Sequence, residues 1–200
     1  TLTWARRRLV FDEFFLFLMT MELEKHGEEK QANPYHFAKS DAFHAYIGKL
    51  PYELTGAQRR TLDEITADMR GPVLMQRLIQ GDVGSGKTIV AFLSMLLVSD
   101  SGYQSAIMAP TEVLAKQHEQ SFEELCVLFG IEKTIVLLTG SMTAKQKREK
   151  RALIKAHPDA LIVGTHALIQ EAVEYDNLAL VITDEQHRFG VRQRETFAKK

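Results

Sequence analysis

The segment 81–88 reads GDVGSGKT and matches the phosphate-binding pattern G-x-x-x-x-G-K-[ST] at every fixed position. Glycines let the backbone curve closely around phosphate groups, and the inward N–H groups then lie at the positive end of a helix. Lys87 can place its ammonium on the β and γ phosphates, and Thr88 can offer its hydroxyl to Mg²⁺. The segment therefore predicts an ATP site between a strand and a helix, with Gly81, Gly84, Ser85, Gly86, Lys87 and Thr88 as its ligands.

Short apolar runs alternate with helical patterns after Pro51. The alternation predicts a mostly parallel sheet covered by helices on both faces, which is an α/β fold. The expected strands are 76–80, 105–109, 134–138, 160–163 and 178–183, and the expected helices are 55–69, 86–98, 111–129 and 143–156.

A long helix is predicted ahead of this fold, over residues 3–25. Its apolar residues face nearly all directions, so it needs partners on more than one side. It is too short and too charged for a membrane span, and no signal-peptide cleavage site follows it. Residues 26–41 are interpreted as a mobile connector, and 41–48 as a short helix. The expected units are therefore 1–48, a linker helix and connector, and 49–200, the ATP-binding domain.

The composition gives no sign of a generally basic surface, because 25 basic residues balance 26 acidic ones. Any contact with DNA must therefore come from local placement of charge. The one cysteine, Cys126, cannot form an internal disulfide, and we interpret it as a buried apolar residue. Sparse cysteine fits the reducing cytoplasm. The chain begins at Thr1 and ends at Lys200, and we interpret both ends as cut points in a longer protein.

An acidic pair follows the last expected strand. Asp184 is expected to hold Mg²⁺, and Glu185 to orient and polarise the attacking water. The alternative is an ordinary acidic turn after a strand. Lys87, Asp184 and Glu185 are thus the candidate catalytic residues, and Gln186 and His187 are interpreted as couplers to a DNA-facing surface or as simple packing residues.

Several motifs together resemble superfamily 2 helicases. In chain order they are Gln58, the P-loop, APTEVLA (109–115), LTGSMT (138–143), VGTHALIQ (163–170) and ITDEQHRFGVRQR (182–194). The DEQHRFGV and TGSMT forms are similar to the RecG family. The opening segment ARRRLVFDEFF (5–15) also resembles the helix that precedes the motor in that family.

The resemblance implies the RecA-like ATP-binding lobe of an ATP-dependent DNA helicase that remodels stalled forks and branched DNA in repair and recombination. It implies that Gln58 reads the adenine edge. It also implies a DNA-binding set of Pro110, Thr111, Thr139, Gly140, Ser141, Gly164, Thr165, His166, Arg188, Arg192 and Arg194. The wedge domain and second motor lobe of the family are not in this sequence. We therefore expect ATP binding with slow hydrolysis, and self-association through the opening helix.

Three alternatives stay open from the sequence. One is a translocase of the transcription–repair coupling type, whose acidic motif usually reads D-E-E-H. Another is a nucleotide-binding module without helicase activity. The third is a P-loop ATPase unrelated to helicases, which would have no need of phosphate-binding loops after three further strands.

Overall fold

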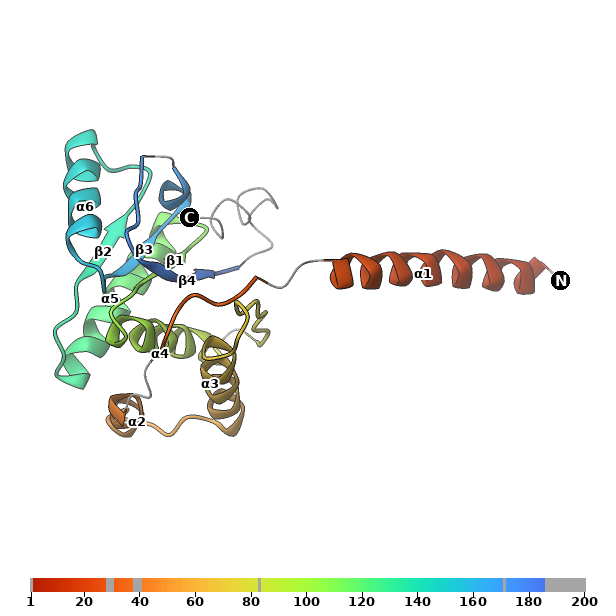
Figure 1. The fold of residues 1–200 in the computed structure, drawn as a ribbon, viewed down its shortest axis with the longest axis horizontal. Helices are drawn as coiled ribbons and strands as arrows, with labels where there is room; N and C mark the ends of the chain where they lie inside the picture. Colours follow the sequence, from red (N-terminus) through yellow and green to blue (C-terminus); the bar gives the residue numbers. More distant parts are fainter. Residues whose placement is uncertain (1, 28–30, 38–40, 83, 171, 186–200) are drawn as a thin grey trace.

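The computed structural model describes residues 2–27, 31–37, 41–82, 84–170 and 172–185 (Figure 1). The helices are α1 (Leu2–Gly27), α2 (Asp41–Gly48), α3 (Gly56–Met69), α4 (Lys87–Asp100), α5 (Glu112–Phe129) and α6 (Ala144–Ala156). The strands are β1 (Gln104–Met108), β2 (Ile135–Leu138), β3 (Leu161–Gly164) and β4 (Leu178–Thr183), and a 3-10 helix, η1, spans His166–Ile169.

The four strands form one sheet in the order β2-β3-β1-β4, and every pairing is parallel. Met108 is in register with Gly164 on one side and with Thr183 on the other, and Gly164 is in register with Leu138. All four strands therefore end at the same level. The loops that leave their carboxyl ends lie along one edge, where ligands bind in open α/β sheets.

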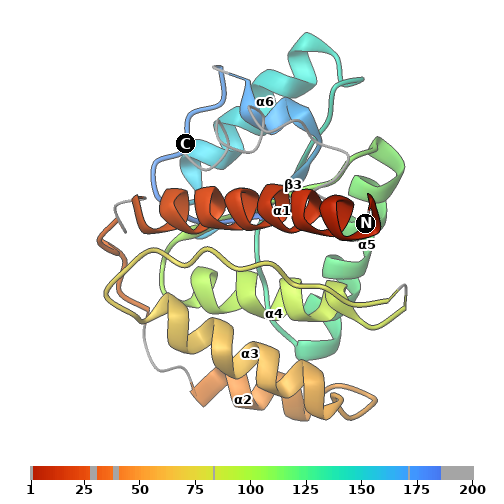
Figure 2. The same cartoon turned by 90° about the vertical axis from the view of Figure 1, so that its right-hand side faces the viewer.

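Both faces of the sheet are covered, because parallel strands need crossover helices that pack on the faces. Figure 1 and Figure 2 show α2, α3 and α4 on one side of the sheet and α6 on the other. Ile107 belongs to the core cluster under α4 and α5, whereas its neighbour Met108 belongs to the cluster with Ile154 of α6. Phe92 in α4 is fully buried and lies 4.7 Å from Phe122 of α5 between ring centroids. The predicted α/β class is confirmed.

The strand expected at Gln76–Gln80 is wrong: these residues are not in a strand. Leu78 and Ile79 are exposed, and within the described chain β4 has no strand neighbour on its outer side. A strand persists only when a neighbour takes up its backbone groups. The segment is held by side chains instead, because Arg77 pairs with Asp68 and Glu64 of α3.

The connector differs from the expected mobile segment, because residues 31–37 pack against the rest of the fold. Asn33 Nδ2 donates to the carbonyls of Met69 (2.7 Å) and Gly71 (3.1 Å) at the end of α3. Tyr35 donates its hydroxyl to the carbonyl of Leu178, at 2.8 Å. Three side chains ahead of position 49 also join the main core: Phe37, Phe43 and Tyr46.

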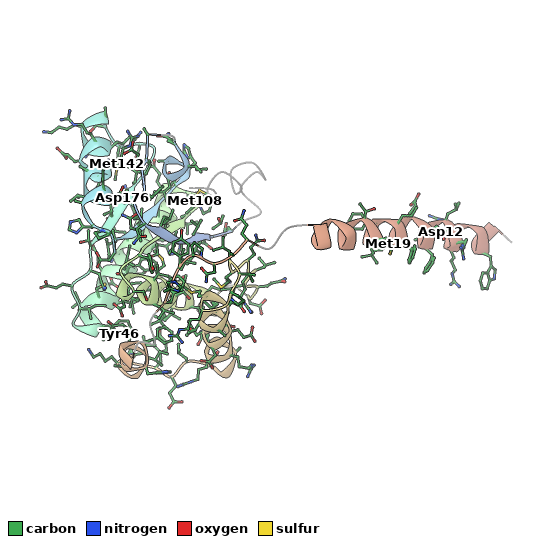
Figure 3. All side chains as sticks on the ribbon, viewed as in Figure 1. Asp12, Met19, Tyr46, Met108, Met142 and Asp176 are labelled. Carbon is green, nitrogen blue, oxygen red and sulfur yellow. The ribbon has the colours of Figure 1, made fainter. Side chains whose placement is uncertain are left out.

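Helix α1 lies apart from the rest of the described chain (Figure 1). Asp12 and Met19 project from it well away from the body (Figure 3). The exposed fractions of Phe11, Phe14, Phe15 and Phe17 are 59%, 64%, 50% and 60%. The expectation that this chain does not bury all four rings is confirmed.

Two further expectations bear on the whole chain. None of the helices that the structure describes is both long and apolar enough to cross a membrane. Cys126 is buried, as expected, and burial raises the pKa of its thiol to about 11.

The exposed rings of α1 generate a prediction about self-association, since monomers rarely leave large contiguous apolar patches in water. We expect the 200-residue chain to self-associate in light scattering and a variant lacking residues 1–27 to be monomeric. A second variant, Phe14→Lys with Phe17→Lys, keeps the helix and should also be monomeric. Equal masses for the intact and shortened chains would contradict this prediction.

Candidate functional site

The P-loop curves through two glycines in the left-handed region, Gly84 (φ 81°) and Gly86 (φ 78°). Helix α4 begins immediately afterwards at Lys87. A Cβ atom on Gly86 would lie 2.3 Å from Gln58 Nε2, and one on Gly81 would lie 2.8 Å from Ser85 Oγ. A side chain at position 86 would therefore meet both a left-handed backbone and the Gln58 amide, and one at position 81 would displace the Ser85 hydroxyl.

Lys87 directs its ammonium back over the loop. Its Nζ donates to the carbonyls of Gly81 and Asp82, both at 2.8 Å. The side chain is exposed, and Thr88 follows it in the first turn of α4, half-buried. A lysine charge, a helix N-terminus and a glycine-lined cradle together suit the oxygens of a phosphate chain.

Gln58 joins α3 to the P-loop. Its Oε1 accepts from the backbone N–H of Thr55 (2.8 Å), which completes a capping box at the start of α3. Its Nε2 donates to the carbonyl of Ser85, also at 2.8 Å. Both amide atoms thus have partners inside the chain, so adenine recognition by Gln58 stays a prediction that requires one of them to be released.

Asp184 follows β4 directly, and it lies close enough to Lys87 of the P-loop for that charge to act on its carboxylate. Its backbone N–H donates to the carbonyl of Met108, at 2.9 Å. His118 Nε2 lies 3.0 Å from its Oδ2, and since an ionised carboxylate can only accept, the imidazole N–H is the donor. This hydrogen bond is the largest cause that lowers the pKa of Asp184; the charges of His118 and Lys87 and the N–H of Glu185 also lower it, and burial opposes them.

An ionised Asp184 near the P-loop fits Mg²⁺, which takes oxygen ligands from one or two carboxylates together with substrate phosphates. Thr88 is the matching hydroxyl ligand in the pattern. The described residues contain no group of three or more His, Cys, Asp or Glu that could hold a metal by themselves. This donor set fits a nucleotide-bound Mg²⁺ and not a metal held by protein ligands alone.

Glu185 has a positive φ of 47°, unlike every other non-glycine residue in the described ranges. Left-handed backbone is disfavoured for residues with a Cβ, and such outliers concentrate at functional sites. The side chain is exposed at this sharp turn. The expected couplers Gln186 and His187, and the expected DNA contacts Arg188, Arg192 and Arg194, lie outside the described residues.

The expected DNA loops follow β1, β2 and β3 on the same edge of the sheet. Their members differ in accessibility: Thr111, Ser141 and His166 are exposed, Pro110 and Gly140 are half-buried, and Thr139, Gly164 and Thr165 are buried. The exposed side chains at these loops are therefore those of Thr111, Ser141 and His166, and DNA contact by the whole expected set stays a prediction.

Glu112 links two of these loops and was not expected from the sequence. Its Oε1 accepts from the backbone N–H of Ser141 (2.7 Å), and its Oε2 accepts from the Ser141 hydroxyl. These bonds hold the pKa of Glu112 below its usual value. An ideal Cβ on Gly140 would lie 3.4 Å from the His166 ring and 3.5 Å from Glu112 Oε1, so the three loops converge here.

His118 was also missed. It lies in the middle of α5, buried beside Phe122 with 6.0 Å between the ring centroids. A single histidine on a helix carries no pattern that announces a partner 66 residues later.

Comparison with known proteins decides the family. The model for DEAD/DEAH box helicase matches residues 55–200, which is most of the chain. The chain belongs to the DEAD/DEAH box helicase family. This helicase chain is 47% identical over 194 residues to the ATP-dependent DNA helicase RecG of Aquifex aeolicus and 45% identical over 200 residues to that of Staphylococcus aureus. These alignments cover 97% and 98% of this chain but only 24% and 28% of the relatives.

Solved structures agree with the family. A RecG structure bound to a three-way DNA junction matches 93% of this helicase chain and 25% of its own chain, with 40% identity and a TM-score of 0.78. A DEAD box protein from Methanococcus jannaschii matches with a TM-score of 0.59 at 22% identity, covers 86% of this chain and 47% of its own, and supports the fold alone. The predicted superfamily 2 motor lobe and the likeness to RecG are confirmed.

The two left-handed glycines give a matched test of the cradle. Gly84→Ala places a Cβ in open space, so it should cost only the backbone penalty, about 1–2 kcal/mol. Gly86→Ala carries the same penalty and also displaces Gln58. We expect a lower free energy of unfolding and weaker nucleotide binding for Gly86→Ala than for Gly84→Ala. Chemical denaturation and calorimetric titration measure these quantities, and equal effects would show that Gln58 does not support the loop.

Proposed function

We propose that this chain is the ATP-binding lobe of a DNA translocase that remodels stalled forks and branched DNA in repair and recombination, in the cytoplasm. The observation that supports the proposal is the position of these segments at one edge of the sheet. Asp184 lies there close enough to Lys87 of the P-loop for their charges to interact, and the loops expected to bind DNA follow β1, β2 and β3 at the same edge.

ATP would be held by its phosphates at the N-terminus of α4. Lys87 would move from the carbonyls of Gly81 and Asp82 to the β and γ phosphates, and Thr88 and Asp184 would hold Mg²⁺. Mg²⁺ would supply neutralisation of the charge on the transferred group. Glu185, on its sharp turn after β4, would orient the attacking water.

DNA would be held by its backbone, because hydroxyl and N–H donors at loop edges suit phosphates and carry no sequence information. Thr111, Ser141 and His166 are the exposed donors. Arg188, Arg192 and Arg194 would add the local positive charge that a net charge of −1 does not provide, and Gln186 and His187 would connect this surface to the ATP site.

The RecG branch is favoured over the coupling-factor type. The acidic motif reads D-E-Q-H at 184–187, and the relatives named above are RecG proteins, one of them bound to a three-way DNA junction. We further propose that residues 1–48 form the linker to a wedge domain and 49–200 the motor lobe.

A second candidate function applies to the chain by itself: a nucleotide-binding module with little turnover. In the family resemblance the second lobe supplies the arginine that stabilises the transition state, and such residues are worth about 10³–10⁵ in rate. The chain spans about a quarter of the RecG relatives, so this contribution would come from outside it. Strong DNA-stimulated ATP hydrolysis by these 200 residues would contradict the proposal that the chain alone only binds nucleotide.

Lys87→Ala tests the nucleotide site. The exposed side chain gives up two hydrogen bonds, so the free energy of unfolding should fall by no more than about 1–2 kcal/mol. Affinity for Mg·ATP should fall about 10- to 100-fold, since a charged hydrogen bond to phosphate is lost. Calorimetric titration measures the affinity, and the exposed Lys145→Ala on α6 is the control. Unchanged affinity in Lys87→Ala would refute the assignment.

Glu185→Gln separates binding from hydrolysis. The amide keeps the size and place of the side chain but loses the carboxylate that polarises water. In the full-length protein we expect Mg·ATP affinity within a few-fold of the original and phosphate release about 10²- to 10⁴-fold slower, followed under single-turnover conditions. If affinity and turnover fell together, Glu185 would instead hold the metal or the turn.

A further inference from the structure

Helix α5 makes side-chain contacts with loops at both outer edges of the sheet. Glu112, its first residue, accepts two hydrogen bonds from Ser141 after β2. His118 donates to Asp184 after β4. Because the strand order is β2-β3-β1-β4, these loops follow the two outermost strands. The helix therefore bridges two loops that the sheet itself separates by two strands.

The bridge is stiff. Glu112 and His118 are six residues apart, which is about 9 Å along a helix. Thr111 caps the helix through the N–H of Leu114, and Gly130 ends it in a left-handed conformation. His118 is buried beside Phe122, and this packing restricts the rotation of its imidazole relative to the body of α5.

Each end of the bridge engages a group that has a task in the proposed function. The N–H and hydroxyl of Ser141 are the donors that a DNA phosphate would use, and the Glu112 carboxylate occupies both. A phosphate that approaches Ser141 must compete with this carboxylate and repel it. The first turn of α5 carries that carboxylate, and the second turn carries the donor that orients Asp184.

We propose that α5 couples phosphate contact at the DNA loops to the orientation of Asp184, with Glu112 and His118 as positioning residues. This inference rests on the proposed function, with DNA at Ser141 and Mg²⁺ at Asp184. This route differs from the expected coupling through Gln186 and His187. It uses α5, which precedes Asp184 in the sequence, whereas Gln186 and His187 follow Asp184.

The test uses linkage between the two ligands. If two sites are coupled, each ligand changes the affinity of the other by the same factor. Affinity of the 200-residue chain for Mg·ADP is measured by calorimetry with and without saturating short oligothymidylate. We expect a ratio of about five-fold or more in the original chain. The ratio should approach one in Glu112→Ala and in His118→Leu.

Matched variants separate positioning from loss of charge or fold. Glu112→Gln and His118→Gln retain a hydrogen-bonding group at the same reach, so they should restore part of the ratio. Glu123→Ala is the control, since Glu123 is exposed on the same helix. Glu112 lies at the surface end of α5, so its variants keep the test decisive if His118→Leu fails to fold.

A second readout follows the imidazole of His118 directly by NMR of histidine-labelled chain. Oligothymidylate should shift this signal in the original chain and in Glu123→Ala, but not in Glu112→Ala. An undiminished ratio or shift in Glu112→Ala would overturn the coupling. Binding of both ligands with a ratio of one would also overturn it and leave the proposed function standing. Failure to bind oligothymidylate at all would refute the DNA function itself, and the coupling with it.

Discussion

The common level at which four parallel strands end determines where the candidate functional groups that follow these strands lie. Backbone hydrogen bonds extend this level one residue past the strands, from Ala109 N–H to the Gly164 carbonyl (2.8 Å) and from Asp184 N–H to the Met108 carbonyl (2.9 Å). A Cβ at Gly164 would lie 2.3 Å from the Leu138 carbonyl, so only glycine allows β3 to end against β2 in this way. Backbone hydrogen bonds alone thus position the first residues of these loops, and the register of the sheet determines where the loops start.

Local signals were enough for most of the fold, because buried parallel strands read as continuous apolar runs and helix starts carry capping residues. The strand β4 was predicted with its exact bounds. The helices expected to start at Thr55 and Thr143 do begin beside these residues, which form capping boxes with Gln58 and Gln146 in the structure. The errors lie where structure depends on distant partners. Residues 76–80 have the composition of a strand but no neighbouring strand to pair with. Residues 31–37 have the composition of a connector, and only the hydrogen bond from Asn33 to the end of α3 shows that they pack against the fold.

The residues of the candidate site also fall into two groups, those that belong to a local motif and those that depend on distant partners. Lys87 and Asp184 belong to contiguous patterns whose chemistry is readable from the sequence. Glu112 and His118 matter only through partners 29 and 66 residues away, so no local pattern could reveal them. Motif position also says nothing about accessibility, because Thr139 and Thr165 stand in the expected DNA loops yet are only 1% and 3% exposed.

A chain with a net charge of −1 can still present anion sites, because the charges that count are placed within a few ångströms of the ligand. At the P-loop, Lys87 and the N-terminus of α4 provide the positive potential. At the loops expected to bind DNA the arrangement is the reverse, since the Glu112 carboxylate accepts hydrogen bonds from the donors of Ser141. A phosphate there gains hydrogen bonds only by displacing a like charge, so its net binding is weaker than the donors alone would give. In the proposed function, weak and exchangeable contact at each phosphate would suit a translocase that releases one step of the strand before it holds the next.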